Sequence, residues 1–228
     1  MKGLLIKDLI LSKKLFISEM IICAVILILM VVYGITSYGE VKSDYSDLNG
    51  ILTVLFGVCG PALLGQTLYA DESCGFMAQS FSSPKMRKDY IKEKYVFSLM
   101  SIIIFLVPSL IAVALCAGFA GADGYADEII WLLKLIGIVL AVQLFSCTFM
   151  ICYYVKIGAA SMVIALIVLL FIATFDLTIV SGFVAGYSEA AENQSLFSIY
   201  IIGIIVFFVS LEIFLFFMSF RWAERKEV

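Results

Sequence analysis

Few residues in this chain of 228 could carry chemistry, and their types exclude several kinds of site. There is no histidine, which excludes imidazole metal ligands and any catalytic dyad or triad that needs an imidazole. The six cysteines lie mostly within apolar runs and form no Cys-x-x-Cys pair, so we expect reduced packing residues and no metal site. Three carboxylates in or near long apolar runs remain as candidates: Glu19, Asp176 and Glu212.

A second candidate is the longest polar stretch of the chain, residues 71–94, which separates two apolar runs. Ser83 followed by Pro84 predicts a helix start, so we expect a short helix, a turn and then a helix that continues into the next apolar run. Such an ordered, mixed-charge segment with aromatic residues is typical of a docking surface, although composition alone supports a solvated loop equally well. The candidate docking residues are Asp71, Glu72, Phe76, Phe81, Pro84, Arg87 and Lys88.

The elements that must position these residues are membrane helices. The chain is 63% hydrophobic and 14% charged, whereas soluble domains are about 45–50% apolar and about 25% charged. Since a bilayer core needs about 20 apolar residues in a helix, we predict an all-α integral membrane protein, residues 1–228 forming one transmembrane domain. Its six predicted spans are roughly 16–38, 51–70, 95–120, 129–154, 158–183 and 197–220.

Lys and Arg residues predict the orientation of these spans. With six spans, all but two of the 15 basic residues fall on one side, the exceptions being Lys42 and Lys134. Because basic residues are enriched in cytoplasmic loops, we expect both termini and residues 71–94 to be cytoplasmic. Residues 1–15 predict a separate amphipathic helix in the inner interface, or alternatively a simple charged flank of the first span.

The three carboxylates are predicted to lie at different depths in the membrane. Glu19 lies near the inner end of the first span, within reach of the interface, and Asp176 lies about 27 Å along the fifth, near the outer surface. Glu212 is the deepest, roughly 13 Å from the cytoplasmic end of its helix. Buried charges in membranes are usually functional or paired, so all three are candidates for a polar translocation pathway.

The loop at 184–196 follows a fifth apolar segment that is longer than a span requires. The stretch from Leu177 to Ser195 contains Gly182 and Gly186, whose spacing is typical of closely packed membrane helices. We expect a gate-like, re-entrant element at the outer surface, the alternative being a helix that ends late and packs its glycines on a neighbour.

Two stretches resemble ABC-2-type transporter permeases. The first is "DESCGFMAQSFSSPKMRKDYIKEKY", with Asp71-Glu72, Phe76, Pro84, Arg87, Ile91 and Lys94-Tyr95 at the spacing of that family, although Ser83 replaces its usual Leu. The second is the opening "MKGLLIKDLILSKK". The resemblance implies the membrane half of an ATP-driven exporter in the bacterial plasma membrane, whose 71–94 segment couples to a separate ATPase.

The same resemblance implies the partners. Two ATPase subunits would work with two permeases, the second being another copy or a paralogue, and ATP and Mg would bind to the ATPase. This chain contains no Gly-x4-Gly-Lys-Ser/Thr loop for nucleotide phosphates, so we expect it not to be an enzyme. An apolar interior with few charges suits an amphipathic peptide or lipid-like substrate, as in exporters of peptide toxins and in bacteriocin immunity.

Three other functions compete with this one. A stand-alone carrier or channel is the main alternative, since Pro61 and Pro108 interrupt two spans, although no internal repeat is visible. An intramembrane enzyme is disfavoured by the missing histidine and by the absence of clustered aspartates. A membrane subunit that only recruits a partner would need residues 71–94 but not Glu212.

Overall fold

The computed structural model describes residues 2–36, 59–120, 125–158 and 194–225, and the elements in these ranges are helices. Residues 59–73 are helical and lead into a short helix, α3. The remaining helices are long. The elements with defined bounds are α1 (Lys2–Thr36), α3 (Phe76–Phe81), α4 (Pro84–Ala120), α5 (Tyr125–Ile157) and α7 (Gln194–Arg225).

Four of these helices contain segments long and apolar enough to cross a membrane: Gly3–Val32, Lys85–Ala112, Ile136–Ile157 and Ile205–Arg225. They match the first, third, fourth and sixth predicted spans. Only residues 59–70 of the second predicted span are described, and almost all of the fifth, with Asp176, Gly182 and Gly186, lies outside the described residues. The all-α membrane class is therefore confirmed, while the count of six stays a prediction.

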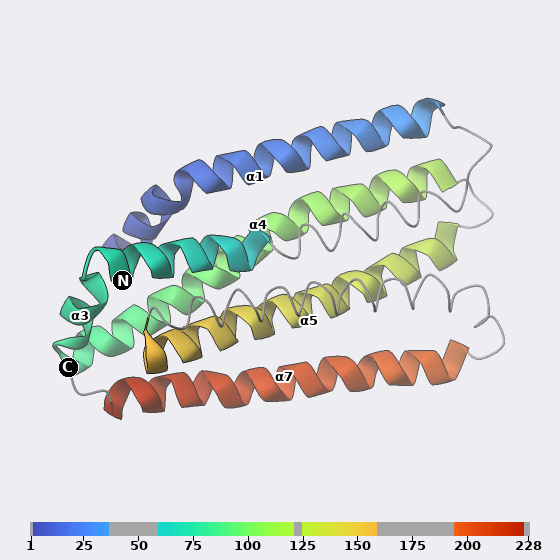
Figure 1. The fold of residues 1–228 in the computed structure, drawn as a ribbon. Coiled ribbons are helices and arrows are strands. Elements are labelled where there is room, and N and C mark those ends of the chain that lie inside the picture. The colour runs from blue at the N-terminus through green and yellow to red at the C-terminus, as the bar shows by residue number, and fades with distance from the viewer. Residues whose placement is uncertain (1, 37–58, 121–124, 159–193, 226–228) are drawn as a thin grey trace.

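The long helices lie side by side in one bundle (Figure 1). Helix α4 contacts α1, α3, α5 and α7, and α5 also packs along α7. The segment Ile136–Ile157 of α5 is the most buried of the four candidate spans, so it forms the centre of the described bundle. The start of α1, the end of α7 and α3 all lie at the same end of the molecule (Figure 1).

Helix α1 differs from the expectation for its first part. We expected a separate interfacial helix at residues 1–15, but α1 is one continuous helix from Lys2 to Thr36. The physical reason is that no proline occurs in this range and its glycines, Gly3 and Gly34, lie near the helix ends. Its polar Asp8 and Ser12 are buried against the bundle, while Ile6, Leu9 and Ile10 face outward.

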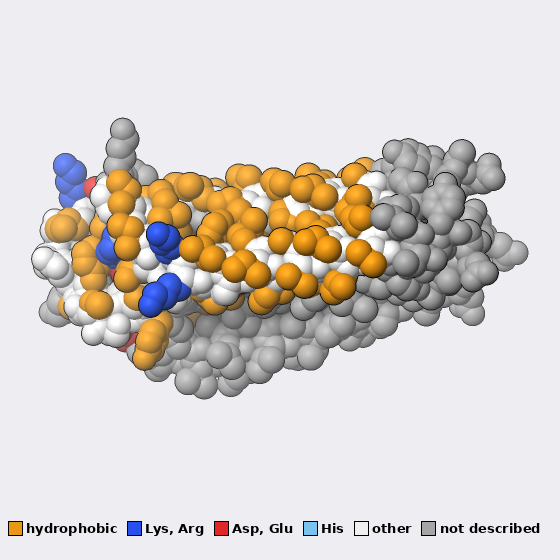
Figure 2. Space-filling model, turned by 90° about the horizontal axis from the view of Figure 1, so that it is seen from above, with side chains coloured by type: hydrophobic (Ala, Val, Ile, Leu, Met, Phe, Trp, Pro, Cys, Tyr) orange, Lys and Arg blue, Asp and Glu red, His pale blue; other side chains and the backbone are white. Residues whose placement is uncertain are grey.

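The outer surface of the bundle is apolar, as expected for a helix bundle in lipid. Figure 2 shows hydrophobic side chains along the face that α1 presents, with Lys and Arg side chains gathered toward the end that carries α3. Within α1, Ile17, Ile21 and Ile28 are exposed in the apolar part, and Lys13 and Lys14 are exposed near the basic end. The basic end therefore also holds the 71–94 segment.

The 71–94 segment has the expected order of short helix, turn and long helix. Gly75 turns the chain between residues 59–73 and α3, and its φ of 67° is the left-handed conformation that glycine adopts at little cost. After α3, Ser83 accepts the first backbone bond of α4 from the Arg87 amide at 3.0 Å, and α4 begins at Pro84. The helix start predicted from Ser83-Pro84 is confirmed.

Candidate functional site

A cluster of charged groups is buried where α1, residues 59–73 and α4 meet. We call Lys7, Asp8, Asp71, Tyr90, Glu93 and Lys94 the charged cluster. Lys94 lies at its centre: its ammonium group is fully buried, pairs with Asp8, and lies 2.7 Å from Asp71 Oδ2. Each of these three residues comes from a different segment, so the cluster joins the start of α1 to the 71–94 segment.

Asp71 accepts further bonds within this cluster. Tyr90 donates its hydroxyl to Asp71 Oδ2 at 2.9 Å, and the Lys7 ammonium group pairs with Asp71 Oδ1. Lys7 Nζ also lies 3.7 Å from the centre of the Phe76 ring. A carboxylate with several charged or polar partners is well compensated for its burial, so Asp71 is fixed in place and with it the entry to α3.

Glu93 is the member of the charged cluster with the least compensation. It is fully buried, and neither carboxylate oxygen has a hydrogen-bond partner in the described part of the chain. Its nearest cation is Lys94, whose Nζ lies 3.9 Å from Glu93 Oε2. That ammonium group already pairs with Asp8 and Asp71. Despite the number of carboxylates here, no group of metal-ligand side chains among the described residues is arranged to hold a metal ion.

Aromatic packing holds α3 against α4. The Phe81 ring meets the Tyr90 ring edge-to-face at 5.8 Å between centres, and the Phe76 ring lies 6.3 Å from the same tyrosine. Phe81 and Met77 are buried, whereas Ala78 and Gln79 on the other side of α3 are exposed. The outward face of α3 is therefore small and polar, and its aromatic residues belong to the interior.

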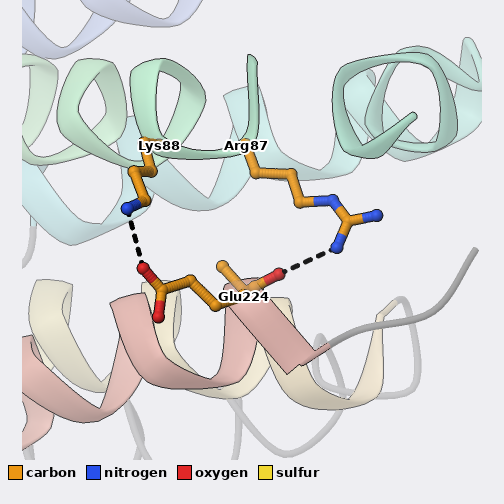
Figure 3. Close-up of a pocket in the computed structure, with 4 residues that line it drawn as sticks. Arg87, Lys88 and Glu224 are labelled. Atoms are coloured by element: carbon orange, nitrogen blue, oxygen red, sulfur yellow. Dashed lines mark hydrogen bonds and ion pairs between the residues drawn. The ribbon is translucent and has the colours of Figure 1, made fainter. Parts of the chain in front are cut away.

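Arg87 joins α3 and α4 to the end of α7. Its Nε donates to the carbonyl of Phe81 at 2.6 Å, and its Nη1 donates to the carbonyl of Ala223 at 3.3 Å. Beside it, Lys88 Nζ forms an ion pair of 2.8 Å with Glu224 Oε1 (Figure 3). Lys156, at the end of α5, lies 4.5 Å from the Trp222 ring centre, so the ends of three long helices meet here.

The predicted docking residues thus fall into two groups. Asp71, Phe76 and Phe81 are buried or half-buried and hold the 71–94 segment together, while Lys88 is exposed and Arg87 half-exposed. Glu72 lies partly buried beside Gly158, which ends α5 with a φ of 75°, and Pro84 begins α4. Contact of any of these seven residues with a partner stays a prediction.

The two described intramembrane carboxylates lie far from the charged cluster. Glu19 is about 16 Å farther along α1 than Asp8; it is 8% exposed, and its Oε2 has no hydrogen-bond partner within the described ranges. The structure thus buries it within the bundle, where we had expected it to reach the interface. Glu212 is half-buried, and its Oε1 lies 3.5 Å from Thr148 Oγ1, which is a long contact for a hydrogen bond.

Sequence reasoning missed the groups outside the 71–94 segment that bind it, namely Lys7, Asp8, Ala223 and Glu224, and the interactions of Tyr90, Glu93 and Lys94 within it. One signal was present: Asp8 is the single acidic residue in an otherwise basic and apolar opening stretch. In lipid, such a residue is expected to turn inward to a partner. The identity of that partner, Lys94, required the fold.

Comparison with known families gives a match over almost the whole chain. The family model described as "ABC-2 family transporter protein" matches residues 3–223. Comparisons with curated proteins and with solved structures gave no match. The matched range includes the charged cluster, α3 and the end of α7, and the helices of the bundle are apolar enough to cross a membrane. The protein is therefore a multi-pass membrane permease subunit that belongs to the ABC-2 transporter family.

Proposed function

We propose that this protein exports an amphipathic peptide or lipid-like substrate from the cytoplasm and is driven by a separate ATPase that docks on α3. The observation that supports this most is the way α3 is held. Aromatic contacts and Arg87 fix it to α4 and α7, Lys7 of α1 lies over its Phe76 ring, and Ala78 and Gln79 face outward. Buried ion pairs hold Asp71 in place just before it. A connector that served only to link two spans would not need these contacts.

In this proposal the ATPase acts on a rigid element. ATP with Mg binds to the ATPase subunits, and their closure moves two α3 helices, one from each of two permeases. Because α3 contacts α1 through Lys7 and Phe76, and is joined to α7 by Arg87, its displacement is passed to the helices of the bundle. The bundle then shifts between two populations with different openings. The small number of charged residues in the predicted spans favours a substrate with a large apolar surface.

The alternative is a stand-alone carrier or channel. Carriers often place broken helices at the middle of the membrane, and we noted Pro108 as such a break. Helix α4 continues through Pro108 without interruption, which weakens that alternative. Transport that persists without any ATPase would favour it.

The test is capture of the co-expressed ATPase subunit by the membrane-inserted protein. We expect Ala78→Glu combined with Gln79→Glu to lower the ATPase affinity at least tenfold, because both positions are exposed on α3 and the change adds two negative charges to the proposed docking face. The matched control is Lys14→Glu, which changes the formal charge by the same amount on an exposed position of α1. Equal capture by all three proteins would refute docking on α3.

Cys74 provides an independent readout at the same place. Its thiol is exposed just before α3, whereas Cys23, Cys147 and Cys152 are buried. We expect a membrane-impermeant maleimide to label it in inside-out vesicles but not in right-side-out vesicles, and the ATPase to slow that labelling. The Cys74→Ser variant gives the background. Labelling only from the outer side would overturn the proposed orientation.

A further inference from the structure

The last turn of α7 and the first turns of α4 enclose a pocket next to α3. Arg87, Lys88, Ala223 and Glu224 line it, and its volume is about 180 Å³ (Figure 3). Lys88 and Glu224 pair across it at 2.8 Å, and their side chains are 52% and 55% exposed. The pocket therefore opens to the surface between segments that are more than a hundred residues apart in the sequence.

Arg87, which lines this pocket, also contacts α3. Its guanidinium group donates to Phe81, the last residue of α3, and to Ala223, in the last turn of α7. The final carbonyl groups of a helix carry a partial negative charge and lack hydrogen-bond partners within the helix. Arg87 therefore supplies hydrogen-bond donors to terminal carbonyl groups of both α3 and α7. Arg87 thus joins the last residue of α3 to the last turn of α7.

The charges around the pocket indicate what enters it. Its lining holds two cations, Arg87 and Lys88, and one anion, Glu224. Exposed Lys85, Arg221 and Arg225 on the same helix ends add to the positive charge. An exposed ion pair such as Lys88–Glu224 contributes little to stability, so an incoming carboxylate can replace Glu224 as the partner of Lys88 at small cost.

We propose that this pocket binds an acidic side chain of the ATPase subunit, so that the end of α7 and α3 together form one docking face. The inference rests on the proposed function and adds a second contact region to it. A protein partner fits better than an anionic bilayer surface, because the rim carries both signs and a uniformly negative surface would approach Glu224 as well as Lys88. Complementary charge of this kind steers association and fixes register.

A matched pair of neutral substitutions tests the proposal, with the affinity of the co-expressed ATPase as the readout. Lys88→Gln removes the cation, and we expect it to lower the affinity three- to tenfold. Glu224→Gln removes the competing anion, and we expect it to leave the affinity unchanged or to raise it up to threefold. Lys14→Gln, which neutralises an exposed lysine on α1, is the control and should bind as the unmodified protein does.

The outcomes separate the proposal from its alternatives. If the Lys88–Glu224 pair only joins α4 to α7, both neutral variants lower the affinity equally, and the proposal is wrong. It is also wrong if neither variant changes the affinity. Loss of copurifying anionic phospholipid in Lys88→Gln, with ATPase binding unchanged, would assign the pocket to the membrane surface instead. Failure of the unmodified protein to capture any ATPase would overturn the proposed function itself.

Discussion

Asp8 and Asp71 of the charged cluster have cations as close partners, whereas the deeper carboxylates Glu19 and Glu212 have no ion-pair partner among the described residues. In the cluster, Asp8 and Asp71 share the fully buried Lys94, and Asp71 has Tyr90 and Lys7 as further partners. About 16 Å farther into the bundle along α1, Glu19 has a buried oxygen with no hydrogen-bond partner in the described residues. Glu212 has only a long contact with Thr148.

The comparison indicates which buried charges fix the relative positions of the helices. A buried ion pair is often no more stabilising than an apolar pair of similar volume, but removal of one partner is strongly destabilising. The cluster is therefore well suited to hold α1, residues 59–73 and α4 in one register. Glu19 and Glu212 form no ion pairs that fix one helix against another. They therefore remain available for the polar translocation pathway that we predicted for carboxylates within the spans.

The largest effect is expected for Lys94→Met, which keeps the length of the side chain and removes its charge. Asp8 and Asp71 would then lose their shared cation, and we expect a loss of about 3–5 kcal/mol in the free energy of unfolding. Thermal unfolding in detergent measures it. The control is Lys92→Met on the exposed side of the same helix. Equal stability of the two variants would break the comparison, because the cluster would then hold nothing.

A smaller effect is expected for Tyr90→Phe. This change removes the hydroxyl that donates to Asp71 at 2.9 Å and leaves the ring contacts with Phe76 and Phe81 in place. Since a hydrogen bond to a charged group contributes about 1.5–3 kcal/mol, we expect a loss at the lower end of that range. Urea titration of the detergent-solubilised protein can resolve it. A loss as large as that of Lys94→Met would mean that Tyr90, and not Lys94, is the centre of the cluster.

The smallest effect on stability is expected for Glu19→Gln. No cation pairs with this carboxyl group among the described residues, so a neutral side chain of the same shape removes no ion pair and should not lower the free energy of unfolding. Asp8→Asn, the same chemical change in the charged cluster, should destabilise clearly. Substrate export by the two variants sharpens the comparison: a pathway role predicts that Glu19→Gln folds normally and exports more slowly. Strong destabilisation by Glu19→Gln would contradict the distinction between the two regions.

The elements of this fold follow from local sequence, and most of them were predictable. Apolar runs of about 20 residues predict membrane helices because the backbone must bond to itself in lipid. Ser83-Pro84 marks the start of α4 for an equally local reason, the fixed φ of proline and its missing amide hydrogen. The continuity of α1 was predictable too, since Lys2–Thr36 contains no proline, but the charges near its start suggested a separate element.

The partners of the charged residues were not predictable in the same way. Lys94 reads as a surface residue of a charged helix, and its pairing with Asp8 depends on two segments that are 86 positions apart. The aromatic residues of α3 illustrate the same limit: Phe76 and Phe81 suggested a contact surface, but burial of apolar area turns them toward Tyr90. Periodicity within α3 does indicate that Ala78 and Gln79 lie opposite, and those positions are exposed.

The contact between Arg87 and Ala223 has a consequence for biosynthesis. The two residues are 136 positions apart, and ribosomes add about 5–20 residues per second, so roughly 7–27 s separate their synthesis. During that interval α3 can already pack on α1 through Phe76 and Lys7, but its contact with α7 through Arg87 cannot yet form. The proposed docking face is thus complete only after the end of α7 has been synthesised, which delays recruitment of the ATPase until the described helices have all been made.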